Sequence, residues 1–186
     1  QMSLIVYYLL TTAYSLSLKR RIAIDIYVLA GLYTARIIAG AAATGIPVSF
    51  WLLAFSAFFF LSLAAVKRQA ELIDSAGRNK LNASGRGYYV DDLPIVAMIA
   101  TGAGYISVLV MTLYVNSSAV VELYAHPKAL WGVCAILLYW ITHTLVAVHR
   151  GHMHDDPVIY AAKDRISQIC LMIILGLVLV ARGAVY

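Results

Sequence analysis

Two basic and two acidic residues stand together where the third apolar stretch of the chain ends. Lys67, Arg68, Glu71 and Asp74 follow this stretch with no Pro or Gly between 66 and 76. A helix that continues through 66–76 puts Lys67, Glu71 and Asp74 on one face, and Arg68 lies beside them. Cations that bind a phosphate, next to carboxylates that hold its divalent metal ion, use this combination of side chains. The alternative is a solvated amphipathic turn without a ligand.

A glycine-rich segment follows, with the sequence NASGRGYYVDD at 82–92. Glycine spacing of this kind is typical of a loop. Arg86 and Tyr88 flank Gly87, and we expect them to close over a bound ligand. A plain connecting loop is the alternative.

The segment 149–165 carries a second group of polar residues. Asp156 followed by Pro157 predicts the cap and the first residue of a short helix. A helix from there aligns four side chains on one side: Asp156, Tyr160, Lys163 and Asp164. His149, His152 and His154 resemble a metal cluster, but their spacing defines no donor geometry, and the nearby carboxylates suit Mg²⁺ better.

Asp25 and Arg36 are two ionisable residues inside the second apolar stretch. Eleven residues make about three helical turns, so the two side chains share one face. Ionisable groups at membrane depth normally face a bundle interior or a wet cavity. Either a functional site or a buried structural pair with other helices accounts for them, and Asp25 is the better candidate for function.

The elements that must position these groups are membrane helices. The chain of 186 residues is 62% hydrophobic and only 12% charged. Spans of about 20 apolar residues suit a bilayer, where the backbone must form helices. Six spans are predicted, at 2–17, 22–43, 48–66, 94–114, 129–149 and 166–185. The fold class is therefore an all-α polytopic transmembrane bundle, a single domain over 1–186.

The charge distribution predicts the orientation of the bundle. The gaps 19–21, 67–93 and 150–165 hold 11 of the 14 Lys and Arg residues. Loops rich in Lys and Arg stay on the cytoplasmic side, so these three gaps are expected there. The net charge of +5 then needs no nucleic-acid partner. The chain opens with Gln1-Met2 and enters a span at once, which leads us to expect further sequence upstream.

Several blocks of sequence carry a family resemblance. They are YSLSLKRR at 14–21, VKRQAEL at 66–72, GRGYYVDDLP at 85–94 and RGHMHDDPVIYAAKDRIS at 150–167. The chain resembles the UbiA superfamily of intramembrane prenyltransferases over essentially its whole length. It is most similar to the branch of decaprenyl-phosphate phosphoribosyltransferase.

The resemblance implies a nine-helix bundle in a bacterial inner membrane, with a cavity open to the cytoplasm and the lipid. The first Asp-rich motif of the family, of the NDxxDxxxD kind, is absent from these residues. The six spans therefore resemble helices four to nine, and three upstream helices are expected to be missing. We expect the chain alone to lack full activity.

The resemblance also implies roles for individual residues. Glu71 and Asp74 stand where the family has its second Asp-rich motif, commonly DxxxD, and are expected to be catalytic and to hold Mg²⁺. Tyr14 and Lys19 depart from the Tyr-x-x-x-Lys pattern of the family by one residue. The expected substrate-binding residues are Tyr14, Lys19, Asp25, Lys67, Arg68, Arg86, Tyr88, Asp155, Asp156, Lys163 and Asp164.

The expected partners are a polyprenyl lipid and a phosphorylated co-substrate. The unusual second motif favours the phosphoribosyl branch, in which polyprenyl phosphate attacks phosphoribosyl pyrophosphate. Prenyl transfer to an aromatic acceptor on the same scaffold is one alternative. A non-catalytic bundle or a transporter is another, although no inverted repeat is visible.

Overall fold

A computed structural model describes residues 21–45, 49–78, 87–153 and 156–183 of the chain. In this part there are five long helices and no β-strand. The long helices are α2 (Ile24–Thr44), α3 (Phe50–Gly77), α4 (Leu93–Val115), α6 (Leu130–His149) and α8 (Arg165–Arg182). The shorter elements are η2 (Val90–Asp92), α5 (Ser118–Leu123), η3 (Pro127–Ala129) and α7 (Pro157–Lys163).

The five long helices, with η2 and η3 extending α4 and α6, are long and apolar enough to cross a bilayer. Large apolar side chains cover the outside of α8; Met172 is 68% exposed and Leu171 is 57% exposed. Such a surface suits contact with lipid and does not suit water. The all-α polytopic bundle predicted from the sequence is thus confirmed, and the predicted span at 2–17 lies outside the described residues.

The helix boundaries follow the local signals of the sequence. α3 runs for 28 residues and ends at Gly77, so it continues beyond the apolar stretch as predicted. Asp156 caps α7 by accepting a hydrogen bond from the N–H of Val158, and Pro157 opens the helix. The segment 115–128 contains the short helix α5, which the sequence analysis did not predict.

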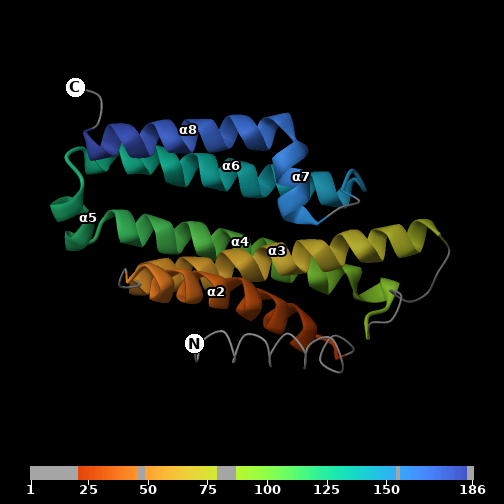
Figure 1. Ribbon diagram of the computed structural model, residues 1–186. Coiled ribbons are helices and arrows are strands. Elements are labelled where there is room, and N and C mark those ends of the chain that lie inside the picture. Colours follow the sequence, from red (N-terminus) through yellow and green to blue (C-terminus); the bar gives the residue numbers. More distant parts are fainter. Residues whose placement is uncertain (1–20, 46–48, 79–86, 154–155, 184–186) are drawn as a thin grey trace.

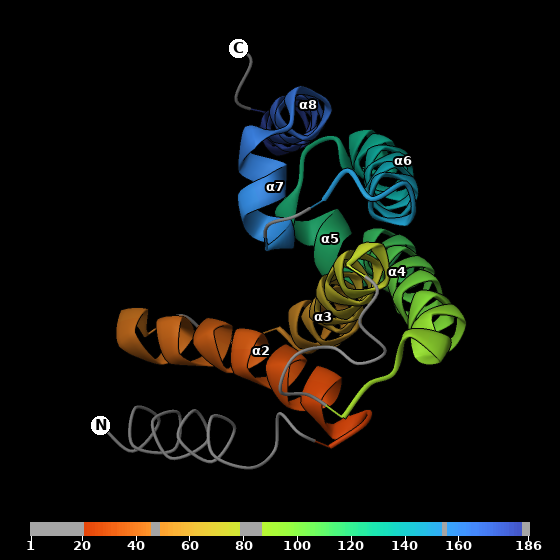
Figure 2. The same cartoon turned by 90° about the vertical axis from the view of Figure 1, so that its right-hand side faces the viewer.

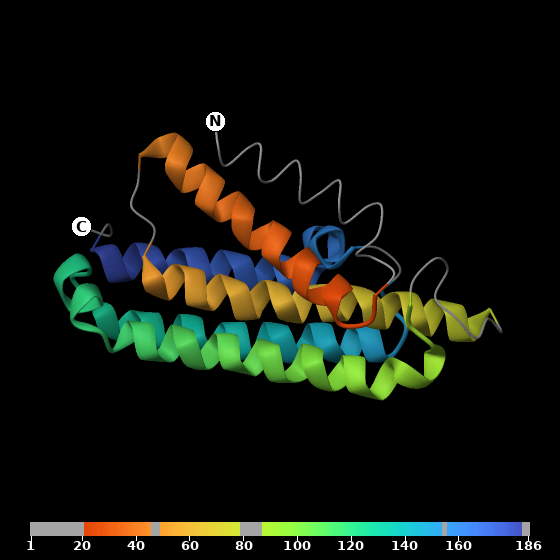
Figure 3. The same ribbon diagram turned by 90° about the horizontal axis from the view of Figure 1, so that it is seen from below.

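The long helices pack as a curved row of neighbours. α3 packs against α2 on one side and against α4 on the other, and α4 then packs on α6 and α6 on α8. Viewed end-on, α2 and α7 lie on one side of the molecule, and α4 and α6 lie on the other (Figure 2). From below, α3, α4, α6 and α8 run nearly parallel to one another, and α2 crosses them obliquely (Figure 3).

Small residues allow the central helices to approach closely. A Cβ atom on Gly104 of α4 would lie 2.8 Å from Cγ2 of Ile141 and 2.9 Å from Oγ of Ser62. The Ser62 hydroxyl donates a 2.7 Å hydrogen bond to the carbonyl of Ala100, which links α3 to α4. Close backbone contact and interhelical hydrogen bonds are the usual stabilising interactions between membrane helices.

The antiparallel order of the helices brings the charged segments together. The start of α2, the end of α3, the start of α4 and the end of α6 with α7 all lie at the same end of the bundle (Figure 1). We call this the charged end. The sequence predicted that its segments share one side of the membrane.

Candidate functional site

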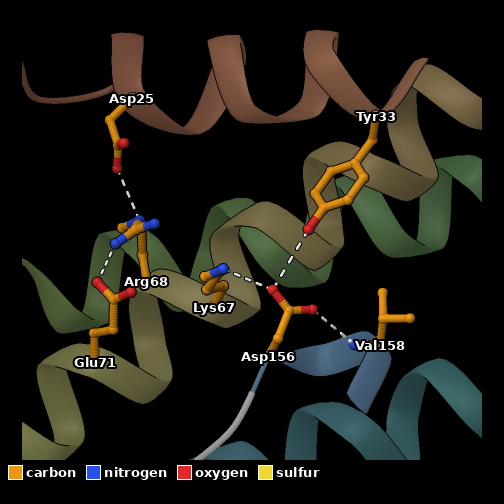
Figure 4. Close-up of polar contacts among 7 residues, drawn as sticks. All are labelled: Asp25, Tyr33, Lys67, Arg68, Glu71, Asp156 and Val158. Carbon is orange, nitrogen blue, oxygen red and sulfur yellow. Dashed lines mark hydrogen bonds and ion pairs between the residues drawn. The ribbon is translucent and has the colours of Figure 1, made fainter. Parts of the chain in front are cut away.

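A buried triad of charged residues joins α2 to α3 at the charged end. Nε of Arg68 lies 2.8 Å from Oδ2 of Asp25, and its Nη1 forms an ion pair with Glu71 (Figure 4). The side chains of Arg68 and Asp25 are 1% and 0% exposed, whereas Glu71 is 34% exposed. The triad therefore has two buried members and one carboxylate that reaches the surface.

The local structure explains how the triad forms. Asp25 is in the first turn of α2, where free backbone N–H groups favour a negative charge. Arg68 and Glu71 are three residues apart on α3, so they lie one above the other on the same helix. An arginine buried at the helix contact requires carboxylate partners, because an unpaired buried charge is costly.

A second charged cluster lies beside the triad and is centred on Asp156. Its Oδ2 accepts a 2.6 Å hydrogen bond from Nζ of Lys67 and a 3.4 Å bond from the Tyr33 hydroxyl. Its Oδ1 accepts a 3.0 Å bond from the backbone N–H of Val158. Asp156 thus connects α2, α3 and α7, and these bonds and the triad are drawn together in Figure 4.

The environment of Asp156 changes its acidity. Burial alone would raise the pKa of this carboxyl, but the bonds from Lys67, the Val158 N–H and Tyr33 outweigh that effect, and the pKa is lowered. A lowered pKa in the folded protein contributes stability above the unfolded pKa of about 3.9. That contribution is lost as the pH falls through the lower, folded pKa.

Two replacements of Asp156 distinguish the contribution of its capping hydrogen bond to stability from that of its negative charge. Asp156→Asn keeps a capping oxygen, whereas Asp156→Ala removes it, so the alanine variant should be about 1 kcal/mol less stable than the asparagine variant. The free energy of unfolding in detergent measures this difference. The deficit of Asp156→Asn relative to the wild type should shrink as the pH falls below about 4. A deficit that stays constant at lower pH would contradict the assigned role of the charge.

Two further expected site residues, Asp74 and Tyr88, make other contacts. Asp74 forms an exposed ion pair with Arg78, with 3.0 Å between Oδ1 and Nη2. Tyr88 is only 2% exposed, and its hydroxyl oxygen accepts a 2.9 Å hydrogen bond from the N–H of Ala23. Burial raises the pKa of the Tyr88 hydroxyl. The Tyr88 hydroxyl therefore links the segment that precedes α4 to the start of α2.

Asp156 and Asp164 lie at the two ends of the expected short helix, but the helix stops one residue before Asp164. α7 ends at Lys163, and Asp164 instead caps α8 by accepting 2.8 Å bonds from the backbone N–H and hydroxyl of Ser167. Its Oδ2 also lies 3.4 Å from Nε2 of His143. Burial would raise the pKa of Asp164, but the bonds from Ser167 and the nearby His143 outweigh it and lower the pKa.

Five expected site residues remain, and one of them lies in the described part of the chain. Lys163 is exposed at the end of α7. Four residues lie outside the described part of the chain: Tyr14, Lys19, Arg86 and Asp155. The structure therefore brings five of the expected site residues into neighbouring clusters: Asp25, Lys67, Arg68, Glu71 and Asp156.

Two further side chains contact expected site residues but were not predicted from the sequence. Tyr33 reaches Asp156, which lies 123 residues further along the chain. His143 lies inside α6 and faces Asp164. In the sequence, each is a polar ring in an apolar helix that contains other aromatic residues, so no local pattern distinguishes it from a packing residue.

An apolar cavity of about 330 Å³ lies beside the charged clusters. Its walls come from α3, α6, α7 and α8 and include Phe59, Trp140, Val158 and Cys170. Val158 also donates its N–H to Asp156, so one turn of α7 contacts both the cavity and the charged cluster. The arrangement places an apolar space next to paired cations and carboxylates.

The described residues do not form a complete metal-binding site. No group of three His, Cys, Asp or Glu side chains in this part of the chain is placed to hold an ion. Glu71 and Asp74 are one helical turn apart, and both reach the surface. Mg²⁺ typically uses one or two carboxylates plus substrate phosphates and water, so this donor set fits that ion.

The fold and the site define a class of protein: a multi-pass helical membrane protein with buried and half-buried ion pairs at one end of its bundle. No known family model matches the chain. The chain is similar to the nodulation protein NoeC of Azorhizobium caulinodans, with 39% identity over 173 residues. This match covers 92% of the chain and 56% of NoeC.

Two bacterial transferases also match. The chain is 28% identical over 173 residues to the decaprenyl-phosphate phosphoribosyltransferase of Mycolicibacterium smegmatis. This match covers 92% of the chain and 54% of that enzyme. The enzyme of the same name from Mycobacterium tuberculosis is 42% identical over 69 residues, 37% of the chain and 23% of the relative. The chain spans about half the length of NoeC and of the M. smegmatis enzyme.

Proposed function

We propose that this chain forms part of a UbiA-type transferase that acts on a polyprenyl phosphate. The reaction we favour is phosphoribosyl transfer from phosphoribosyl pyrophosphate. The similarity to decaprenyl-phosphate phosphoribosyltransferases supports a transferase of this general kind. The observation that carries the proposal is the position of Lys67, Arg68 and Glu71 at the charged end, beside an apolar cavity.

A lipid phosphate needs an apolar space for its tail beside a cation for its phosphate. The apolar cavity and Lys67 would serve these two purposes. The apolar cavity along Phe59 and Trp140 suits an isoprenoid tail, because burial of each CH₂ group contributes about 0.8 kcal/mol. The phosphate of such a lipid would then lie near Lys67, whose side chain is 29% exposed. Lys67 can bind this phosphate by exchanging its bond to Asp156.

In the proposed reaction, an oxygen of the polyprenyl phosphate attacks the anomeric carbon of the ribosyl donor. A new carbon–oxygen bond forms, the bond from that carbon to pyrophosphate breaks, and pyrophosphate leaves with the bonding electrons. Negative charge grows on the leaving group, so fixed cations lower the barrier. Lys67 would provide such a cation, and Asp25 and Glu71 hold Arg68 in place beside it.

Mg²⁺ is the metal ion that we propose for this site, with Glu71 and Asp74 as its protein ligands. When bound, it would neutralise charge on the pyrophosphate. Glu71 would be oriented by Arg68, and Asp74 by Arg78. The triad and the Asp156 cluster together contain three carboxylates and two cations, so their net charge of −1 favours a bound cation.

We also propose that the charged end faces the cytoplasm of a bacterial inner membrane. The excess of Lys and Arg in the segments that meet there supports this orientation.

Radiolabelled donors test the proposed reaction in the complete protein. With phosphoribosyl pyrophosphate labelled in the ribose, and decaprenyl phosphate, the label should enter the lipid fraction, and one pyrophosphate should be released for each labelled lipid. In parallel, labelled prenyl diphosphate is supplied with an aromatic acceptor such as 4-hydroxybenzoate. Label in the aromatic product and none in the ribosylated lipid would favour the alternative reaction and contradict the proposal.

A further inference from the structure

A second cavity, of about 450 Å³, lies in a groove between α4 and α6, with α3 at its base. α4 and α6 form the side of the bundle away from α2 and α7 (Figure 2), so this groove is separate from the proposed transferase site. Its lining residues are Gln69, Ala97, Thr101, Tyr105, Thr142, Leu145, Val146, His149 and Arg150. We call it the α4–α6 groove.

The groove has an apolar wall and one basic end. Ala97, Leu145 and Val146 form part of its wall, and Arg150 stands where α6 ends, at the charged end of the bundle. No described carboxylate forms an ion pair with Arg150. None of the described residues that line the groove is acidic, so their charge favours an anionic ligand.

The other polar side chains of the groove do not require a polar ligand. Oε1 of Gln69 has no hydrogen-bond partner among the described residues, but this atom is buried, so a ligand in the groove cannot reach it. Thr142 donates its hydroxyl hydrogen to the carbonyl of Leu138 and lies 3.3 Å from the Tyr105 hydroxyl. Arg150 is therefore the group that would bind the polar end of a ligand.

The length of the groove suits a lipid lying against the protein. From Thr142 to His149 the helix rises about 10 Å, which exceeds the headgroup layer of a bilayer and enters its hydrocarbon core. Basic pockets between membrane helices on the cytoplasmic side commonly bind anionic lipid headgroups. A soluble anion would use only Arg150 and would leave the apolar wall without a partner.

We infer that the α4–α6 groove binds one anionic phospholipid, such as phosphatidylglycerol. Arg150 binds the phosphate, and an acyl chain lies along Leu145 and Val146. Phosphatidylethanolamine is a poorer fit, because the described lining residues include no carboxylate that could balance its ammonium group. This inference does not depend on the transferase activity.

The test uses the complete protein in nanodiscs of phosphatidylcholine alone, or with added phosphatidylglycerol or phosphatidylethanolamine. Native mass spectrometry measures the retained lipid, and a thermal melt measures stability. Of the three lipids, only phosphatidylglycerol should be retained, and it should raise the melting temperature of the protein. Arg150→Gln should weaken its retention at least about tenfold, as expected for a hydrogen bond between charged groups.

Arg165→Gln is the matched control, because it removes the same charge from an exposed residue near the charged end, outside the groove. It should leave phosphatidylglycerol retention unchanged. Equal retention of all lipids, or equal losses in the Arg150 and Arg165 variants, would overturn the inference. So would an Arg150 variant that melts lower by the same amount with and without phosphatidylglycerol, because Arg150 would then act only at the end of α6.

Discussion

Replacing Glu71 by Gln in the complete protein is expected to lower the turnover of phosphoribosyl transfer at least about 100-fold, which corresponds to about 2.7 kcal/mol of transition-state stabilisation. The replacement keeps an oxygen that can accept a hydrogen bond from Arg68, and Asp25 still balances the charge of Arg68. It removes the one triad carboxylate that reaches the surface. The loss should therefore appear in rate and not in folding.

Steady-state kinetics with a Mg²⁺ titration, beside a thermal melt, measure this effect. If Glu71 holds the metal ion, the variant should also need more Mg²⁺ to reach its half-maximal rate. Glu122→Gln is the matched control, because it makes the same change on exposed α5, at the other end of the bundle. Wild-type turnover in Glu71→Gln would remove this residue from the proposed site and reduce Glu71 to a partner of Arg68.

The second large effect concerns the stability of the bundle. Asp25→Ala leaves the buried guanidinium of Arg68 with one carboxylate that is itself partly exposed. Removal of one partner from a buried ion pair typically costs 3–5 kcal/mol, and we expect a loss at the lower end, about 3 kcal/mol, because Glu71 remains. The free energy of unfolding in detergent, measured with a denaturant, gives this value directly.

A double replacement distinguishes a packing role from an electrostatic one. Asp25→Leu with Arg68→Met fills the same space with apolar atoms, and buried ion pairs can often be replaced in this way without loss of stability. This pair should recover most of the stability lost in Asp25→Ala. As a comparison, Asp74→Asn breaks an exposed ion pair and should change stability by less than about 1 kcal/mol. A double variant as unstable as Asp25→Ala would show that the charges themselves stabilise the helix contact.

Recovery of stability without recovery of turnover would link the triad to catalysis. Arg68 is too deeply buried to bind a phosphate without some rearrangement, as its side chain is only 1% exposed. In the proposed site it fixes the position of Glu71, and the neighbouring Lys67 contacts the substrate. The double variant would then fold and would retain Lys67, yet transfer slowly.

The membrane helices could be predicted from the sequence because each depends on about twenty consecutive residues. Hydropathy summed over such a window is a local property, and the backbone in lipid has no alternative to the helix. The extension of α3 to Gly77 and the cap of α7 at Asp156 were also local signals. The end of α7 before Asp164 was missed, because the same residue types suit a continuing helix and the cap of the next one.

The ionic partners could be decided only by the tertiary structure. Lys67 and Arg68 are neighbours in the sequence with the same charge, yet Arg68 is buried against Asp25, and Lys67 reaches Asp156, 89 residues away. Adjacent residues on a helix point in directions about 100° apart, so their environments depend on which helix packs on each face. Charge and spacing identified the candidates for the site. Helix packing determined which of them are buried in ion pairs and which remain accessible to a ligand.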